Sequence, residues 1–103
     1  MSIVEKHVDA IDNTANAKVN YNNASFALTD SVNAIYLNHD VKELGSNAEI
    51  RSAKIASLTS AEQQAIRLLE NELEIARAKE ARTKAEVEQM KYIIRALEAK
   101  AEA

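Results

Sequence analysis

Carboxylates at helical spacing are the residues here that most resemble a metal-binding or acid–base pattern. Glu70 and Glu74 lie four residues apart, which places both side chains on one face of a helix. A di-metal helical site also needs a Glu-x-x-His unit, and neither His7 nor His39 has a glutamate three residues before it. We therefore interpret the acidic residues as a solvated helix face: Glu70, Glu72, Glu74, Glu86 and Glu88.

Nucleophilic and phosphate-binding chemistry has no recognisable motif in this sequence. The chain has no cysteine, which excludes thiolate metal sites, disulfides and cysteine nucleophiles. Its single glycine, Gly45, cannot build a phosphate-cradling loop, and no serine stands in a Gly-x-Ser-x-Gly elbow. The sequence therefore predicts a protein that is not an enzyme and that needs no cofactor and no catalytic metal.

Basic side chains in the second half of the sequence could bind nucleic acid. Arg77, Lys84, Lys91 and Arg95 fall near one side of a helix, from which they could reach phosphates. Glutamates interleave with them, and the formal net charge of −3 is unlike that of a dedicated DNA-coating protein. The favoured interpretation is a solvated face, with nucleic-acid contact as the alternative.

A second candidate recognition surface is rich in tyrosine and asparagine. Tyrosine adds flat apolar area and asparagine adds adaptable hydrogen bonds, a combination that suits binding of a protein or a small ligand. The competing interpretation is a loosely packed surface that tolerates substitution. The residues are Asn20, Tyr21, Asn22, Asn23 and Tyr36.

The scarcity of glycine and proline divides the chain into two long helices. One glycine and no proline occur among 103 residues, so few positions can end a helix. The sequence predicts a single helical domain with a first helix over 1–38, a corner over 39–45 and a long second helix over 46–103. Asn13 and Asn23 are candidate kink positions in the first helix, because asparagine is a poor helix former.

Capping residues mark where these helices begin and end. We expect Ser2 and Ser46 to cap the two long helices and Asp40 to begin a single turn in the corner. Gly45 is expected to adopt the left-handed conformation that ends this turn. The residues around Thr59 also resemble a cap, so the second helix is either continuous or restarts there.

Two apolar patterns accompany the helices. In the first helix, apolar residues recur at helical spacing: Val4, Val8, Ile11, Ala15, Val19, Phe26, Leu28, Val32 and Ile35. In the second, steps of three and four residues give the 3.5-residue repeat of a left-handed coiled coil or helical bundle. Its positions are Ile66, Leu69, Leu73, Ala76, Glu80, Thr83, Val87, Met90, Ile94, Leu97 and Ala101.

The difference in helix length predicts an assembly. If the first helix folds back antiparallel, it covers the second only to about residue 85, and apolar residues beyond that point project bare. The sequence therefore predicts an all-α fold, a long antiparallel helical hairpin that forms a dimer or a higher helical bundle. The seam of this homo-oligomer is expected at Leu69, Leu73, Val87, Met90, Ile94 and Leu97.

No secretory or membrane-spanning segment is recognisable in the sequence. The first residues lack a basic and then apolar signal, and no apolar run approaches the roughly 20 residues of a membrane span. We expect no membrane partner and a cytoplasmic location, which is the host cytoplasm if the protein is viral.

The residues around the glycine resemble a corner in small helical proteins encoded by tailed bacteriophages, in which a Gly-x-Asn-Ala/Glu-Glu-x-Arg motif precedes a long charged helix. The resemblance rests on Leu44–Arg51 and on Leu69–Glu74, and it covers about residues 44–98. It implies a viral origin. The leading hypothesis is an oligomeric, non-enzymatic protein that binds and modulates a host or phage protein. The alternatives are a nucleic-acid accessory of phage replication or recombination, and an anti-defence sponge for a small signalling molecule.

Overall fold

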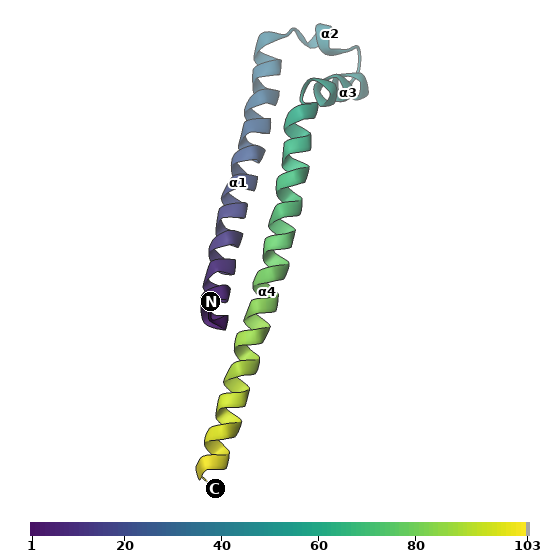
Figure 1. Cartoon of the computed structure of the whole chain (residues 1–103). Helices are drawn as coiled ribbons and strands as arrows, with labels where there is room; N and C mark the ends of the chain where they lie inside the picture. Colours follow the sequence, from purple (N-terminus) through teal and green to yellow (C-terminus); the bar gives the residue numbers. More distant parts are fainter. Residues whose placement is uncertain (103) are drawn as a thin grey trace. The chain divides into compact units, whose positions relative to one another are not determined.

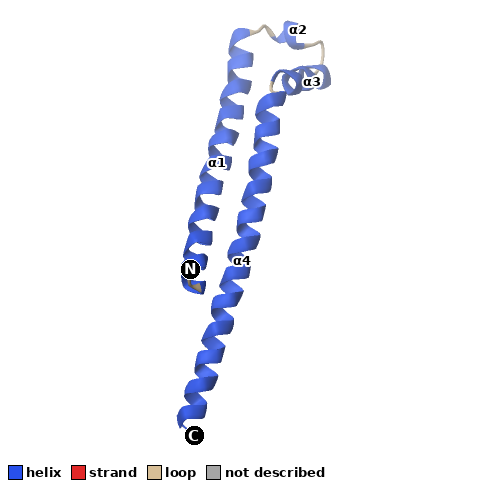
Figure 2. Ribbon diagram, viewed as in Figure 1, coloured by secondary structure: helices blue, strands red, loops and turns tan. Residues whose placement is uncertain are grey.

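The chain is all-α, as the sequence predicts. The computed structural model describes residues 1–102, and these contain helices and no strand. The helices are α1 (Ile3–Asn38), α2 (Val41–Leu44), α3 (Ala48–Leu58) and α4 (Ser60–Glu102) (Figures 1 and 2). Among the described residues, no helix combines the length and the apolar character needed to cross a membrane.

The residues form two compact units. The first unit contains Met1–Lys18 together with the part of the chain from Glu72 onward, and the second unit contains Val19–Asn71. Within the first unit, the start of α1 lies beside the second half of α4, and the two segments run in opposite directions (Figure 1). His7 and Thr83, which are 76 residues apart in the sequence, are hydrogen-bonded there.

The first helix begins where its cap predicts. The backbone N–H of Glu5 donates to Ser2 Oγ at 3.1 Å, which satisfies one of the free donors at the start of α1. The helix continues without interruption through Asn13 and Asn23, the two candidate kink positions. The hydroxyl of Thr14 donates to the backbone carbonyl four residues earlier, so this polar side chain is satisfied inside the helix.

The corner contains the single turn that the sequence predicts, but Gly45 does not adopt the left-handed helical conformation. Asp40 begins α2, although its side chain makes no capping hydrogen bond. Gly45 has φ 151° and ψ 161°, a region that is essentially restricted to glycine. A Cβ atom at this position would collide with the side chain of Ile50. The position therefore needs glycine both for its backbone conformation and for space.

The cap of α3 is Asn47, and the expectation that Ser46 caps this helix is wrong by one residue. The Asn47 side-chain oxygen accepts a hydrogen bond from Ile50 N at 2.9 Å. Asn47 is extended, with φ −143° and ψ 172°, as an N-cap residue should be.

The expected single helix over 46–103 is interrupted at Thr59, where the chain changes direction (Figure 1). Thr59 is 1% exposed and has φ −113° and ψ 20°, which ends α3. Its hydroxyl donates to the Ile55 carbonyl at 2.8 Å and accepts from Gln63 Nε2 at 3.1 Å. These hydrogen bonds satisfy a buried polar side chain at the junction.

The heptad pattern of α4 is confirmed as its buried face over most of its length. Each of its positions from Ile66 to Met90 is buried or half-buried, whereas every residue from Lys91 to Glu102 is exposed. Leu73 and Thr83, which belong to the first unit, are the deepest of these positions, at 4% and 5% exposed.

The apolar pattern of α1 does not mark its buried face over the first six positions, which corrects the simplest interpretation of the sequence, whereas its last three members, Leu28, Val32 and Ile35, are half-buried. Its first six members are all exposed: Val4, Val8, Ile11, Ala15, Val19 and Phe26. In the first unit the buried or half-buried positions lie one residue earlier: Ile3, His7, Ala10, Thr14 and Ala17. Small and polar side chains such as Ala10, which is 1% exposed, let α1 approach α4 closely and leave the larger β-branched side chains facing outward.

Candidate functional site

The inner seam of the first unit is polar where α1 meets α4. His7 Nδ1 lies 2.8 Å from Thr83 Oγ1, and the Thr83 hydroxyl donates to the Glu80 carbonyl at 3.0 Å. A threonine hydroxyl has one hydrogen, so with that hydrogen given to Glu80 its oxygen accepts from His7. Nδ1 of His7 is therefore the donor in this hydrogen bond. This pair fixes the level at which the two segments lie side by side.

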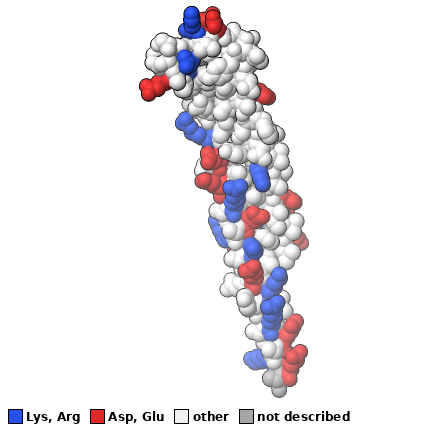
Figure 3. Space-filling model, turned by 180° about the vertical axis from the view of Figure 1, so that it is seen from behind, with Lys and Arg blue, Asp and Glu red and all other residues white. Residues whose placement is uncertain are grey.

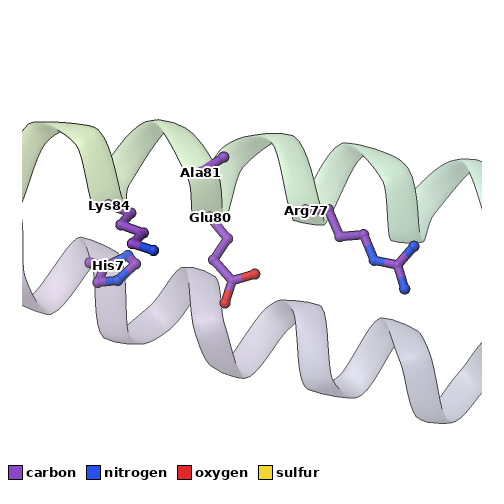
Figure 4. Close-up of a pocket in the computed structure, with 5 residues that line it drawn as sticks. All are labelled: His7, Arg77, Glu80, Ala81 and Lys84. Carbon is purple, nitrogen blue, oxygen red and sulfur yellow. The ribbon is translucent and has the colours of Figure 1, made fainter.

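A hollow of about 440 Å³ opens beside this pair and is predominantly basic. In Figure 4, the Lys84 side chain extends toward His7, Glu80 points toward α1, and Ala81 points away from it. Arg77 and Lys84 are both exposed, whereas Glu80 is half-buried. We call this feature the basic hollow; its lining residues are His7, Arg77, Glu80, Ala81 and Lys84.

The exposed apolar face of α1 borders the basic hollow. We call it the α1 stripe and define it as Val4, Val8, Ile11 and Ala15. Val4, Val8 and Ile11 are 49%, 50% and 42% exposed. Their spacing of four, three and four residues is that of a helix that packs against another helix.

Different charges border the two edges of the α1 stripe. One residue along an α-helix corresponds to about 100° around its axis. His7 precedes Val8 by one residue, so it borders one edge of the stripe, where it also lines the basic hollow. Glu5 and Asp12 each follow a stripe residue by one position, so they border the opposite edge. The stripe therefore has a basic edge on the side of α4 and an acidic edge on the other side.

The end of α4 forms a second exposed apolar surface. We call residues 91–102 the α4 tail, and every one of them is exposed. Ile93, Ile94 and Leu97 are 54%, 45% and 62% exposed. A hollow of about 260 Å³ in the same part of α4 is lined by Glu88, Lys91, Tyr92 and Arg95, and none of the three apolar residues lines it.

The residues of the oligomer seam expected from the sequence differ in exposure within the single chain. Leu73 is 4% exposed within a single chain, so its side chain is not accessible to a second copy. Leu69, Val87 and Met90 are half-buried. Ile94 and Leu97 are the most exposed of the expected seam residues, at 45% and 62%.

The four basic residues considered for nucleic acid do not form an uninterrupted positive surface. Arg77 and Lys84 line the basic hollow with Glu80, while Lys91 and Arg95 line the tail hollow with Glu88. Figure 3 shows Lys and Arg alternating with Asp and Glu along one face of the molecule. Such alternation of charge is typical of a solvated helix face, and nucleic-acid contact remains the alternative.

The tyrosine- and asparagine-rich residues belong to the second unit and do not share one face. Asn20, Tyr21, Asn22 and Asn23 are consecutive in α1, so their side chains point in different directions around the helix. Tyr21 is half-buried, and Tyr36 is 50% exposed several turns farther along. The structure does not bring these five residues together as one recognition surface.

The role of His7 was missed from the sequence, although a signal for it exists. The positions Ile3, His7, Ala10, Thr14 and Ala17 follow the same alternation of four and three residues as the seam of α4. Within residues 1–102, no three His, Cys, Asp or Glu side chains are grouped so that they could hold a metal ion.

Comparisons of the chain with protein-family models, with curated proteins and with solved structures found no match.

Proposed function

We propose that this chain is a non-enzymatic interaction protein, a helical hairpin that associates with copies of itself and binds a partner protein through the α4 tail. The observation that carries the proposal is the exposure of Ile93, Ile94 and Leu97, at 54%, 45% and 62%. Burial of each such side chain in a complex is worth about 1.5–3 kcal/mol. An exposed apolar helix end is therefore best explained as a binding surface.

The chemistry of the tail indicates the kind of partner. Ile94 and Leu97 lie three residues apart, a spacing typical of helices that dock into an apolar groove. Lys91 lies three residues before Ile94 and Arg95 one residue after it, so both border Ile94 on one side of the helix, and an acidic rim on that groove would complement this edge of the tail. The mechanism is occlusion, in which the tail covers the partner's groove and excludes other ligands from it.

We expect the variant Ile94→Asp/Leu97→Asp to lose its binding to the partner protein, because two charged side chains would have to be buried in an apolar groove. The measurement is capture of proteins, from a lysate of the cells in which the chain is made, by immobilised wild-type and variant chains. Ile75→Asp is the matched control, since Ile75 is 62% exposed on the same helix outside the tail. A protein retained by the wild type and the control but lost by the tail variant supports the proposal. Equal retention by all three contradicts it.

A nucleic-acid accessory is the second candidate function, because Arg77, Lys84, Lys91 and Arg95 are exposed along one helix. Binding of an oligonucleotide that weakens steeply with salt, and that is lost in Lys84→Glu/Arg95→Glu, would favour this candidate over the protein partner. We expect the interleaved glutamates to prevent such binding.

A further inference from the structure

We propose that the α1 stripe is the surface on which a second copy of this chain docks, with the two α1 helices parallel and related by a two-fold axis that runs along them. This inference rests on the self-association in the proposed function and assigns it a surface. The α4 tail then remains free for the partner protein.

The α1 stripe is expected to pack against a partner, because the larger apolar side chains of α1 in the first unit are exposed. Within residues 1–18, the buried face of α1 contributes one large aliphatic side chain, Ile3, which is half-buried. The outer face contributes Val4, Val8 and Ile11, each between 42% and 50% exposed. Since the spacing along the stripe is that of a coiled-coil seam, the natural occupant is another helix.

Charge decides which helix fits. A helix that packs on the stripe on the side of His7 also lies over the basic hollow, near Arg77 and Lys84. That helix must therefore combine an apolar face with an acidic edge. The first turns of α1 have both properties, because Glu5 and Asp12 border the far edge of the stripe. A second copy of α1 is thus complementary to the groove that α1 and α4 form together.

The position of the charges also decides the relative direction of the two copies. A two-fold rotation about an axis parallel to the helices exchanges the two edges of the stripe, so the acidic edge of one copy faces the basic hollow of the other. A two-fold rotation about an axis perpendicular to the helices keeps acidic edge beside acidic edge and hollow beside hollow. Like charges would then oppose one another, which disfavours an antiparallel pair.

The acidic and basic residues also lie at corresponding heights along the helix axis. His7 is level with Thr83, and the two segments are antiparallel. Glu5, two residues before His7, is therefore level with the neighbourhood of Lys84, and Asp12, five residues after it, with that of Arg77. A parallel two-fold pair keeps each residue level with its own copy. It therefore brings Glu5 of one chain opposite Lys84 of the other, and Asp12 opposite Arg77.

The test is a charge exchange. The acidic-edge variant is Glu5→Lys/Asp12→Lys, and the hollow variant is Arg77→Glu/Lys84→Glu. Each variant alone places like charges opposite one another at four contacts in a symmetric pair, two in each direction, so we expect its dimer dissociation constant to rise about 10- to 100-fold. In a 1:1 mixture, every one of these positions regains an opposite charge. We therefore expect the mixture to form heterodimers with about wild-type affinity, measured by sedimentation at matched concentrations.

Controls separate this inference from the proposed function. Lys79→Glu/Arg82→Glu makes the same charge change on α4 at positions that do not line the basic hollow, and it should leave the dimer intact. Dimers that persist in both charge variants, or a mixture that stays dissociated, would overturn the parallel pairing. If Ile94→Asp/Leu97→Asp alone abolishes the dimer, the tail mediates self-association, and the inference fails while the proposed function stands. A wild-type chain that never self-associates contradicts both.

Discussion

Replacing Leu73 with alanine is expected to destabilise the chain by about 2–5 kcal/mol, because it removes a large side chain from the buried face of α4. Leu73 is 4% exposed, and the other deeply buried residues of the first unit, Ala10 and Thr83, are smaller. Domains of this size unfold with about 5–15 kcal/mol, so the loss is a large part of the total. Urea unfolding followed by circular dichroism, at one protein concentration for all variants, measures it.

Ile75→Ala is the matched control for this prediction. Ile75 lies two residues farther along the same helix and is 62% exposed, so its truncation should cost less than about 1 kcal/mol. A Leu73→Ala variant as stable as Ile75→Ala would show that the heptad face of α4 is not buried in solution.

The second large effect is expected at Gly45. Substitution by alanine should cost about 1–3 kcal/mol for the backbone conformation alone, since the φ of 151° at Gly45 is rarely adopted by residues with a side chain. The new Cβ atom would also collide with Ile50. Both effects act in the second unit, where the corner joins α2 to α3. The free energy of unfolding, measured as for Leu73, should therefore fall by more than the backbone contribution.

The double variant Gly45→Ala/Ile50→Ala separates these two causes. Truncating Ile50 removes its contact through Cγ2, the closest one, but leaves Ile50 Cβ and Arg51 N at 3.0 Å from the new Cβ atom and leaves the backbone conformation unchanged, so the double variant should recover part of the lost stability relative to Gly45→Ala. Since Ile50 is 49% exposed, Ile50→Ala alone should have a small effect. A neutral Gly45→Ala would contradict the conformation described for this corner.

Local sequence signals were sufficient for much of the fold. The cap at Ser2, the single turn after Asp40 and the heptad face of α4 from Ile66 to Met90 all follow from neighbouring residues. The shift of the α3 cap from Ser46 to Asn47 could not be predicted in the same way, because both residue types cap helices well. The backbone conformation of Gly45 sets the direction in which the chain enters α3, and it therefore affects which of the two residues becomes the N-cap.

The buried face of α1 within the first unit could not be predicted from hydrophobicity. Two stripes of coiled-coil spacing lie one residue apart on this helix, and the more apolar one, with Val4, Val8 and Ile11, is exposed. The structure uses the other stripe, because Ala10 allows close approach and His7 bonds to Thr83. That hydrogen bond joins residues 76 positions apart, so no local pattern reveals it. The site inferred on α1 depends on this choice of face.

The mass of the unmodified chain in solution, measured by light scattering beside Val8→Asp/Ile11→Asp, tests most directly whether the α1 stripe is covered by a second copy. The proposed pairing requires twice the 11.4 kDa of one chain for the wild type and the mass of one chain for the variant. A wild-type mass of 11.4 kDa at high concentration, or a variant that keeps the doubled mass, would contradict it.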